Sequence, residues 1–238
     1  MSRLLLVRHG QASFFGDGYD QLSPLGHRQA RRVGEYLHAR RPQPDRVWVG
    51  PLQRHRQTHA GALAAVQAAG GAWPSPVALA TLDEHQAAHV VKHVLDLDDA
   101  AGDGGLRTDP GPDPGDRERV VRDYFRRWRA VCVDWIAGRT PDTGAEPWAE
   151  TRRRAASALA EMTADAGPGE TRLAFSSGGL ISMIVGEVLG LGDEQVLDLS
   201  LVLANAALVE LRFSSGRVGL DAFNIVAHLE ADDLLTMV

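Results

Sequence analysis

The chain has 238 residues, of which 44% are hydrophobic and 24% are charged, and its formal net charge is −6 at pH 7. This balance is typical of one globular domain with an elaboration, and the negative charge argues against a nucleic-acid partner, which usually needs a basic face. The single cysteine, Cys132, excludes an intramolecular disulfide and suits a reducing compartment. The first apolar run is too short for a signal-peptide core, and no apolar run approaches the length of a membrane span. We therefore expect a cytoplasmic protein with no membrane partner.

The first predicted element is a buried strand that ends in polar residues. The four consecutive apolar residues 4–7 predict a central strand of a parallel sheet with helices on both of its faces. Arg8, His9 and Gly10 follow directly, and ligands of open α/β sheets bind outside the carboxyl ends of the strands. Arg8 would place a fixed positive charge there and His9 a base or nucleophile. The alternative is that Arg8 forms a surface ion pair and His9 only caps the strand.

Helices and strands then alternate along the chain. Residues 11–21 have no period and predict a loop that overhangs the end of the first strand. After it we predict a helix from Ser23 to the prolines at 42 and 44, a strand at 46–49, a helix at 52–69 and a strand at 77–82. This order is typical of a parallel sheet with right-handed crossover connections.

The regular alternation stops after residue 82. Residues 96–116 are rich in Asp, Gly and Pro, which predicts a mobile loop. Apolar residues at helical spacing over 120–135 predict a helix with arginines along another side: Arg119, Arg122, Arg126 and Arg129. This helix either packs on the body with a solvated basic face or covers the strand ends, with one or more arginines facing a ligand.

The C-terminal part returns to regular patterns. We predict a helix at 147–166, a strand at 172–176, a helix at 178–189, a strand over 199–213 centred on 207–211, and a hairpin return at 217–226. These elements predict a three-layer α/β/α sandwich with a mostly parallel sheet. We interpret residues 1–238 as a single domain, with a helical insertion at about 85–146 over the carboxyl ends of the strands.

Five segments occur in an order known from one family. Residues 6–10 read L-V-R-H-G, residues 20–30 resemble D-x-x-L-[ST]-x-x-G-x-x-Q-A, residues 50–58 resemble S-P-L-x-R-A-x-x-T, residues 82–84 fit L-x-E, and residues 175–179 lie where the family has a strand ending in S-H-G-G. The chain thereby resembles the histidine phosphatase superfamily, the phosphoglycerate-mutase-like proteins. The resemblance covers nearly the whole chain apart from its irregular middle region.

The resemblance implies a chemistry for four residues. His9 would be the nucleophile that becomes phosphohistidine, Arg8 and Arg54 would clamp phosphate oxygens, and Glu84 would be the general acid and base. Two adjacent guanidinium groups should lower the pKa of His9 and keep its imidazole unprotonated. Asp83 is a rival to Glu84 if the register shifts by one residue, and the acidic pair could instead simply begin a surface loop.

The same resemblance implies further substrate-binding residues: Gly10, Gln11, Ser177 and Gly178. Ser177 stands where the family has its second histidine, and losing one such donor costs about 10²–10³ in rate. His55 or His85 could substitute as donors, or Ser177 could only cap the following helix. If the family geometry survives, the substitution Ser177→His should raise the rate.

We therefore expect a phosphomonoester phosphatase that acts through phospho-His9 on a phosphorylated small molecule. The resemblance implies no metal and no cofactor. His55 and His59 lie one helical turn apart, but no acidic or cysteine partner is near them in sequence. The alternatives are a weakened phosphate-binding or regulatory relative and a phosphomutase, although residues 13–17 do not match the mutase motif W-N-x-x-x-x-F-x-G-W. The oligomeric state stays open, with a homodimer as one option.

Overall fold

A computed structural model describes residues 1–12, 20–40, 43–100, 114–230 and 233–237. The chain divides into two compact units. The sheet unit comprises Met1–Glu84 and Arg152–Val238, and the helical unit comprises His85–Thr151. All the strands described below belong to the sheet unit.

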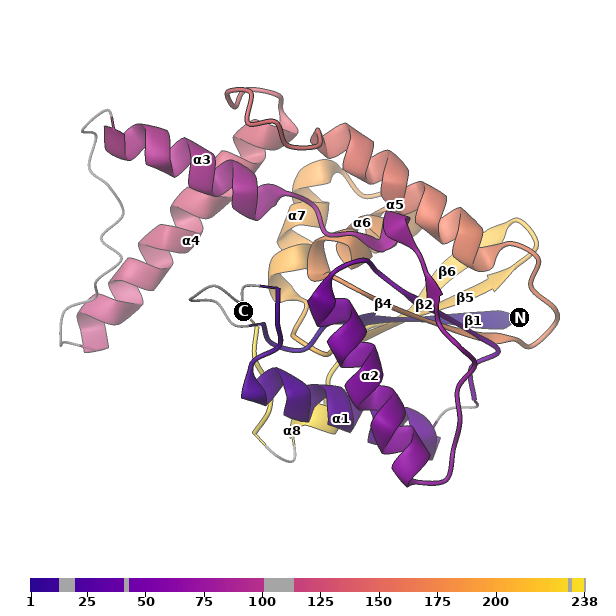
Figure 1. Ribbon diagram of the computed structural model, residues 1–238. Coiled ribbons are helices and arrows are strands. Elements are labelled where there is room, and N and C mark those ends of the chain that lie inside the picture. Colours follow the sequence, from indigo (N-terminus) through magenta and orange to yellow (C-terminus); the bar gives the residue numbers. More distant parts are fainter. Residues whose placement is uncertain (13–19, 41–42, 101–113, 231–232, 238) are drawn as a thin grey trace. The chain divides into compact units, whose positions relative to one another are not determined.

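The sheet is mixed and, in the described part of the chain, has six strands in the order β3-β2-β4-β1-β5-β6 (Figure 1). These are β1 (Ser2–Arg8), β2 (Arg46–Val49), β3 (Val77–Ala78), β4 (Thr171–Ser176), β5 (Leu208–Ser214) and β6 (Arg217–Ile225). The first four neighbours pair in parallel, and β5 and β6 add antiparallel pairs on the other side of β1. As predicted, β1 is a central strand, and its residues Leu4–Val7 are all buried.

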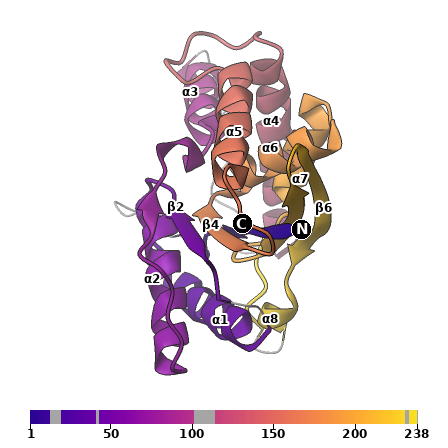
Figure 2. The same ribbon diagram turned by 90° about the vertical axis from the view of Figure 1, so that its right-hand side faces the viewer.

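Helices cover both faces of this sheet (Figure 2). On one face lie α1 (Pro24–Arg40), α2 (Gln53–Ala68) and the short α8 (Ala227–Glu230). On the other lie α6 (Gly178–Leu189), α7 (Asp193–Val202) and α5 (Trp148–Thr163), which begins in the helical unit. The predicted α/β class with helices on both sheet faces is therefore confirmed.

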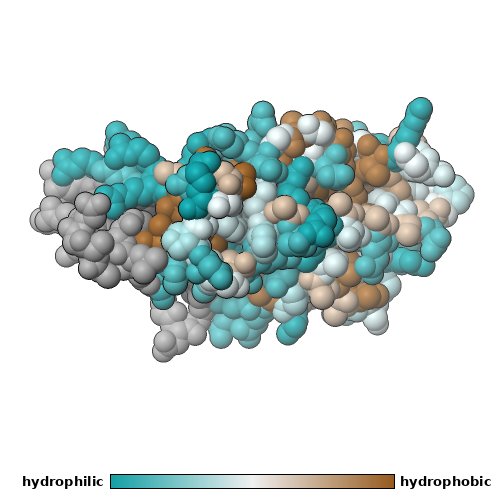
Figure 3. Space-filling model, turned by 90° about the horizontal axis from the view of Figure 1, so that it is seen from above, coloured by the Kyte–Doolittle hydropathy of each residue, from teal (hydrophilic) through white to brown (hydrophobic). Residues whose placement is uncertain are grey.

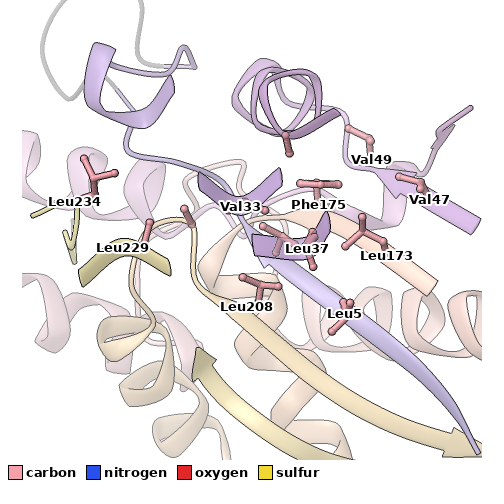
Figure 4. Close-up of a cluster of buried hydrophobic side chains, with 13 residues drawn as sticks. Leu5, Val33, Leu37, Val47, Val49, Leu173, Phe175, Leu208, Leu229 and Leu234 are labelled. Atoms are coloured by element: carbon pink, nitrogen blue, oxygen red, sulfur yellow. The ribbon is translucent and has the colours of Figure 1, made fainter. Parts of the chain in front are cut away.

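The core between the sheet and α1 is a cluster of 13 buried hydrophobic residues (Figure 4). Alternate residues of β1 contribute Leu5 and Val7, because successive side chains of a strand point to opposite faces. Helix α1 also packs closely on α2. A Cβ atom at Gly34 would lie 2.1 Å from the carbonyl oxygen of Ala62, so the two helices meet backbone to backbone.

The helical unit contains α3 (Ala87–Ala100), α4 (Pro114–Ile136) and the first turn of α5. Its core includes Cys132 and a cluster of aromatic rings in which Trp135 and Trp148 meet edge to face at 5.4 Å. The structure confirms the helix predicted at 120–135, and the arginines at 119, 122 and 126 are exposed. Most of the loop predicted at 96–116, and residues 13–19 of the earlier loop, lie outside the described residues.

Three predicted elements differ from the structure. Of the loop predicted at 96–116, residues 96–100 belong to helix α3 and residues 114–116 to helix α4. Residues 199–202 belong to helix α7, not to a strand, because Asp193 and Glu194 supply the acidic first turn that favours a helix. The strand expected at 77–82 is limited to Val77 and Ala78, and residues 80–82 form a 3₁₀ helix. This strand lies at the sheet edge and pairs only with β2, so the chain can leave the sheet early.

A few large hydrophobic side chains are exposed among the described residues. The exposed large hydrophobic side chains, which include Val77, Phe125, Leu189 and Val202, belong to different elements. Figure 3 shows hydrophilic and hydrophobic residues interspersed on one side of the molecule. None of the helices in the described ranges has both the length and the apolar character that crossing a membrane requires.

Candidate active site

His9 directly follows β1 and is held on both sides by main-chain hydrogen bonds. Its N–H donates to the Ser176 carbonyl at 2.9 Å, and its carbonyl accepts the Ala206 N–H at 3.0 Å. The imidazole is only 6% exposed. Its Nδ1 lies 2.7 Å from the carbonyl oxygen of Gly10, and its Nε2 lies 3.1 Å from Nε of Arg54.

These two contacts define the protonation of His9. A carbonyl oxygen only accepts hydrogen bonds and a guanidinium only donates them, so Nδ1 carries the proton and Nε2 presents its lone pair. Burial, followed by the charges of Arg54 and Arg8, lowers the pKa of His9 well below its ordinary value. The imidazole is therefore neutral at neutral pH, and the lone pair of Nε2 accepts the hydrogen bond from Arg54.

Arg54 lies in the first turn of α2 and is held by Asp20. Its Nη1 donates to Oδ1 of Asp20 at 2.9 Å. The other oxygen of Asp20 accepts the N–H of Gln53 at 2.7 Å, so this carboxylate also binds the N-terminus of α2. The sequence prediction assigned no role to Asp20. Its position two residues before Leu22-Ser23, one residue short of the D-x-x-L-[ST] spacing, was the available signal.

Arg8, at the end of β1, extends beside the N-terminus of α6. Its Nη1 donates to the carbonyl oxygens of Leu203 and Met237, the latter at 3.0 Å. Its Nε lies 3.1 Å from the place that a Cβ atom on Gly178 would occupy, so the missing side chain gives the guanidinium room. The positive charges of Arg8 and Arg54 thus both act on His9.

The main-chain N–H groups of Gly10 and Gln11 donate hydrogen bonds to side chains of the protein. The N–H of Gly10 donates to Oγ1 of Thr58 at 3.0 Å, and the N–H of Gln11 donates to Oε1 of Gln29 at 2.7 Å. A Cβ atom at Gly26 would lie 2.1 Å from the carbonyl oxygen of Gln11. In this structure both residues therefore attach the segment after β1 to α1 and α2.

The two candidate acids have different surroundings. Asp83 accepts the main-chain N–H of Glu84 at 2.8 Å with its own carboxylate. Arg154 donates to the carbonyl oxygens of both residues, at 2.7 Å for Asp83 and 3.2 Å for Glu84, which fixes the backbone here. The negative charge of Glu84 acts on His55, whose pKa it raises against the stronger opposing effects of burial and Arg54. The charge of Glu84 thus acts on the buried imidazole of His55.

Ser177 is the N-cap residue of α6, but within the described residues its side chain forms no cap hydrogen bond. Its Oγ lies 2.6 Å from Nε2 of His55, and both side chains are fully buried. The rings of His55 and His9 have centroids 5.8 Å apart. Burial and then the charge of Arg54 lower the pKa of His55 to about 3. The alternative in which Ser177 only caps the helix is therefore not what the structure shows.

The remaining histidines considered from the sequence have other partners. The ring of His85 packs in the helical unit against Trp135 and Trp148, with centroids 6.1 and 6.0 Å away. His59 meets Phe175 edge to face at 5.4 Å. In the described ranges, no group of three or more His, Cys, Asp or Glu residues is arranged to hold a metal ion.

The fold and these residues define an α/β protein with an electropositive histidine site at the carboxyl ends of its parallel strands. The sequence model of the histidine phosphatase superfamily (branch 1) matches residues 4–88 and 109–226. The chain belongs to this superfamily.

Solved structures agree with this assignment at the level of the fold. Bacillus stearothermophilus YhfR has 15% identity and a TM-score of 0.64, with 96% of this chain and 100% of that chain covered. Entamoeba histolytica phosphoserine phosphatase has 19% identity, 96% and 100% coverage and a TM-score of 0.59. A mycobacterial glucosyl-3-phosphoglycerate phosphatase has 22% identity, 94% and 98% coverage and a TM-score of 0.59. No curated protein sequence matches the chain significantly.

Proposed function

We propose that the protein is a phosphomonoester phosphatase that acts through a phosphohistidine on His9. The observation that carries the proposal is the 3.1 Å contact from Nε of Arg54 to Nε2 of His9. It places an unprotonated nucleophilic nitrogen beside a planar group suited to phosphate oxygens. Membership of the superfamily and the phosphatases among the structural neighbours support the same class of activity.

In the first step, Arg54 and Arg8 bind non-bridging oxygens of the phosphoryl group, and the N-terminal N–H groups of α6 add to this positive field. The lone pair of Nε2 attacks phosphorus while the ester P–O bond breaks. Glu84, in its acid form, gives its proton to the leaving oxygen. The products are a free alcohol, phospho-His9 and a Glu84 carboxylate.

In the second step, the Glu84 carboxylate removes a proton from a water molecule, and the water oxygen attacks phosphorus. The P–N bond breaks, its electron pair returns to Nε2, and inorganic phosphate leaves. Nδ1 stays protonated throughout because the carbonyl of Gly10 accepts its hydrogen bond. The cycle therefore returns His9 to the same tautomer in which it began.

The test is turnover of p-nitrophenyl phosphate together with trapping of an acid-labile, base-stable phosphoprotein. We expect both in the native chain and neither in His9→Ala. His59→Gln is the matched control, because it also removes a buried imidazole with a lowered pKa. Equal turnover in the native chain and His9→Ala would contradict the proposal.

A second candidate, a phosphate-binding or regulatory relative with little turnover, is favoured by one observation. Ser177 lies where the family pattern has a histidine, so one charged donor is missing at that position. Calorimetric titration with inorganic phosphate separates the two functions. Binding that requires Arg54, without turnover of any aryl phosphate, would support this second candidate.

A further inference from the structure

Three positions of the chain depart from the family segments, and the structure places the three together. Gly50 stands where the pattern has serine, His55 where it has alanine, and Ser177 where it has histidine. A Cβ atom on Gly50 would lie 2.3 Å from Nδ1 of His55, and Oγ of Ser177 lies 2.6 Å from its Nε2. The imidazole at position 55 therefore fits only because both neighbours are small.

The environment of His55 indicates which nitrogen carries its proton. Nδ1 is buried and has no hydrogen-bond partner among the described residues, whereas Nε2 faces a hydroxyl. An orphaned buried N–H is rarer than an unsatisfied acceptor, so we assign the proton to Nε2. Nε2–H then donates to Oγ of Ser177, and the hydroxyl hydrogen of Ser177 is left to donate elsewhere.

Ser177 and His9 follow the ends of two neighbouring strands. Strands β1 and β4 pair in parallel with Arg8 opposite Ser176, so His9 and Ser177 are the next residues of the two strands. Gly178, which follows Ser177, lies against the guanidinium of Arg8. A phosphoryl group held by Arg8 beside His9 thus lies within the region to which Ser177 belongs.

We propose that His55 and Ser177 form one hydrogen-bonded donor for the phosphoryl group, in which Ser177 touches an oxygen of the group and His55 positions the hydroxyl. The inference rests on the proposed function, because it needs a phosphoryl group at His9. It makes Ser177 a catalytic residue and His55 a positioning residue. The imidazole that the family carries at the end of β4 is supplied here from α2.

The experiment measures kcat/KM for p-nitrophenyl phosphate and the dissociation constant of orthovanadate in a set of variants. His55→Leu keeps the approximate side-chain size and removes the donor, and Ser177→Ala removes only the hydroxyl. We expect each variant to lower kcat/KM and to raise the dissociation constant of orthovanadate, in both cases by about tenfold to a hundredfold. The kcat/KM of the double variant should be no more than about threefold below that of either single variant, because the two residues act as a unit.

Two further variants separate hydrogen bonding from space filling. The amide nitrogen of His55→Gln lies near the place of Nε2, so this variant should stay within about fivefold of the native values. Ser177→His alone should lower the rate, because its ring would meet His55 at the present 2.6 Å contact. This reverses the expectation drawn from the sequence. Ser177→His with His55→Ala should recover at least about tenfold over Ser177→His.

The results decide the inference in either direction. Three outcomes would each overturn it. The first is a folded His55→Leu with native kcat/KM and orthovanadate affinity, the second is a double variant in which the two single losses multiply, and the third is a His55→Gln whose losses equal those of His55→Leu. Thermal unfolding checks the fold, and if His55→Leu does not fold, Ser177→Ala and His55→Gln carry the test. Orthovanadate binding without turnover would contradict the proposed function but still test this donor. A native chain that does not bind orthovanadate would contradict both.

Discussion

Two buried arginines of the sheet unit differ in the partners they have. Arg172, at the start of β4, donates to the carbonyl oxygens of Met162 and Ala164 at 2.9 and 2.6 Å. It also pairs with Glu170 at 2.9 Å, and aromatic rings lie on its guanidinium, with centroid distances of 5.8 Å for Trp48 and 5.6 Å for Phe213. Every one of these partners is part of the folded framework.

Arg54 is nearly as buried, with 7% of its surface exposed, but its partners are of another kind. It donates to a neutral imidazole nitrogen and to Asp20, whose side chain is 40% exposed. A phosphate oxygen is a better acceptor for a guanidinium than a neutral ring nitrogen. If Arg54 binds phosphate as we propose, then replaceable partners, more than burial itself, distinguish an arginine that binds a ligand from one that holds the fold.

The largest effect that would test this contrast is on catalysis. Arg54→Lys should lower kcat/KM for an aryl phosphate about 10²–10³-fold, because an ammonium group cannot bridge two oxygens in the plane of a guanidinium. The midpoint of thermal unfolding should change little. Steady-state kinetics and calorimetry on the same preparation check both. A variant within threefold of the native rate would remove Arg54 from the proposed mechanism.

The corresponding change at the other arginine should affect stability alone. Arg172→Leu leaves two buried carbonyl oxygens without their donor and should lower the free energy of unfolding by about 2–4 kcal/mol. Urea titration measures this loss. At a temperature where the variant is folded, its kcat/KM should equal the native value, and a large fall would mean that the two arginines do not divide their roles as described.

The pH dependence of stability gives a test at His228, a buried imidazole outside the proposed active site. Burial lowers the pKa of His228 to about 4, so protons bind preferentially to the unfolded chain once the pH falls below the ordinary value of 6.5. Between pH 7.5 and 5 this group alone should remove about 2 kcal/mol of stability. His228→Gln should flatten the pH dependence of unfolding by that amount. An unchanged slope in the variant would assign the acid sensitivity to other groups.

The smallest expected effect concerns the exposed partner of Arg54. Asp20→Asn keeps the side-chain size and removes a charge on a side chain that is 40% exposed, so kcat/KM should fall less than about tenfold. Asp221→Asn on β6 is the matched control, because the Asp221 side chain is 39% exposed and also pairs with an arginine, Arg212 of β5, at 2.8 Å. A loss above a hundredfold in Asp20→Asn would show that Asp20 acts on the substrate itself.

Much of the candidate site could be predicted from the sequence, because its residues follow the ends of strands. The apolar run 4–7 indicated a central strand, and everything that follows such a strand in a parallel sheet emerges at one edge. His9 and Arg54 could therefore be expected to approach each other. Asp20 was harder to include, because it lies one residue nearer to Leu22 than the aspartate of the family segment.

The contact between His55 and Ser177 was harder to predict, because 122 residues separate them and neither lies in a pattern that specifies a partner. Side-chain distances of this kind depend on helix position, which periodicity does not give. Residues 199–202 show a second limit. An apolar run of this length suits a strand or a buried helix equally well, and only its neighbours decide.

The glycine contacts of α1 have a consequence for how the site responds to change. At Gly26 the helix touches the main chain of Gln11, two residues after the nucleophile, and at Gly34 it touches the main chain of Ala62 on the helix that carries Arg54. The spacing between imidazole and guanidinium is thus set by peptide groups, which have no rotamers to adjust. Substitutions among the surrounding side chains should leave this spacing unchanged, whereas a single methyl group at either glycine would alter it.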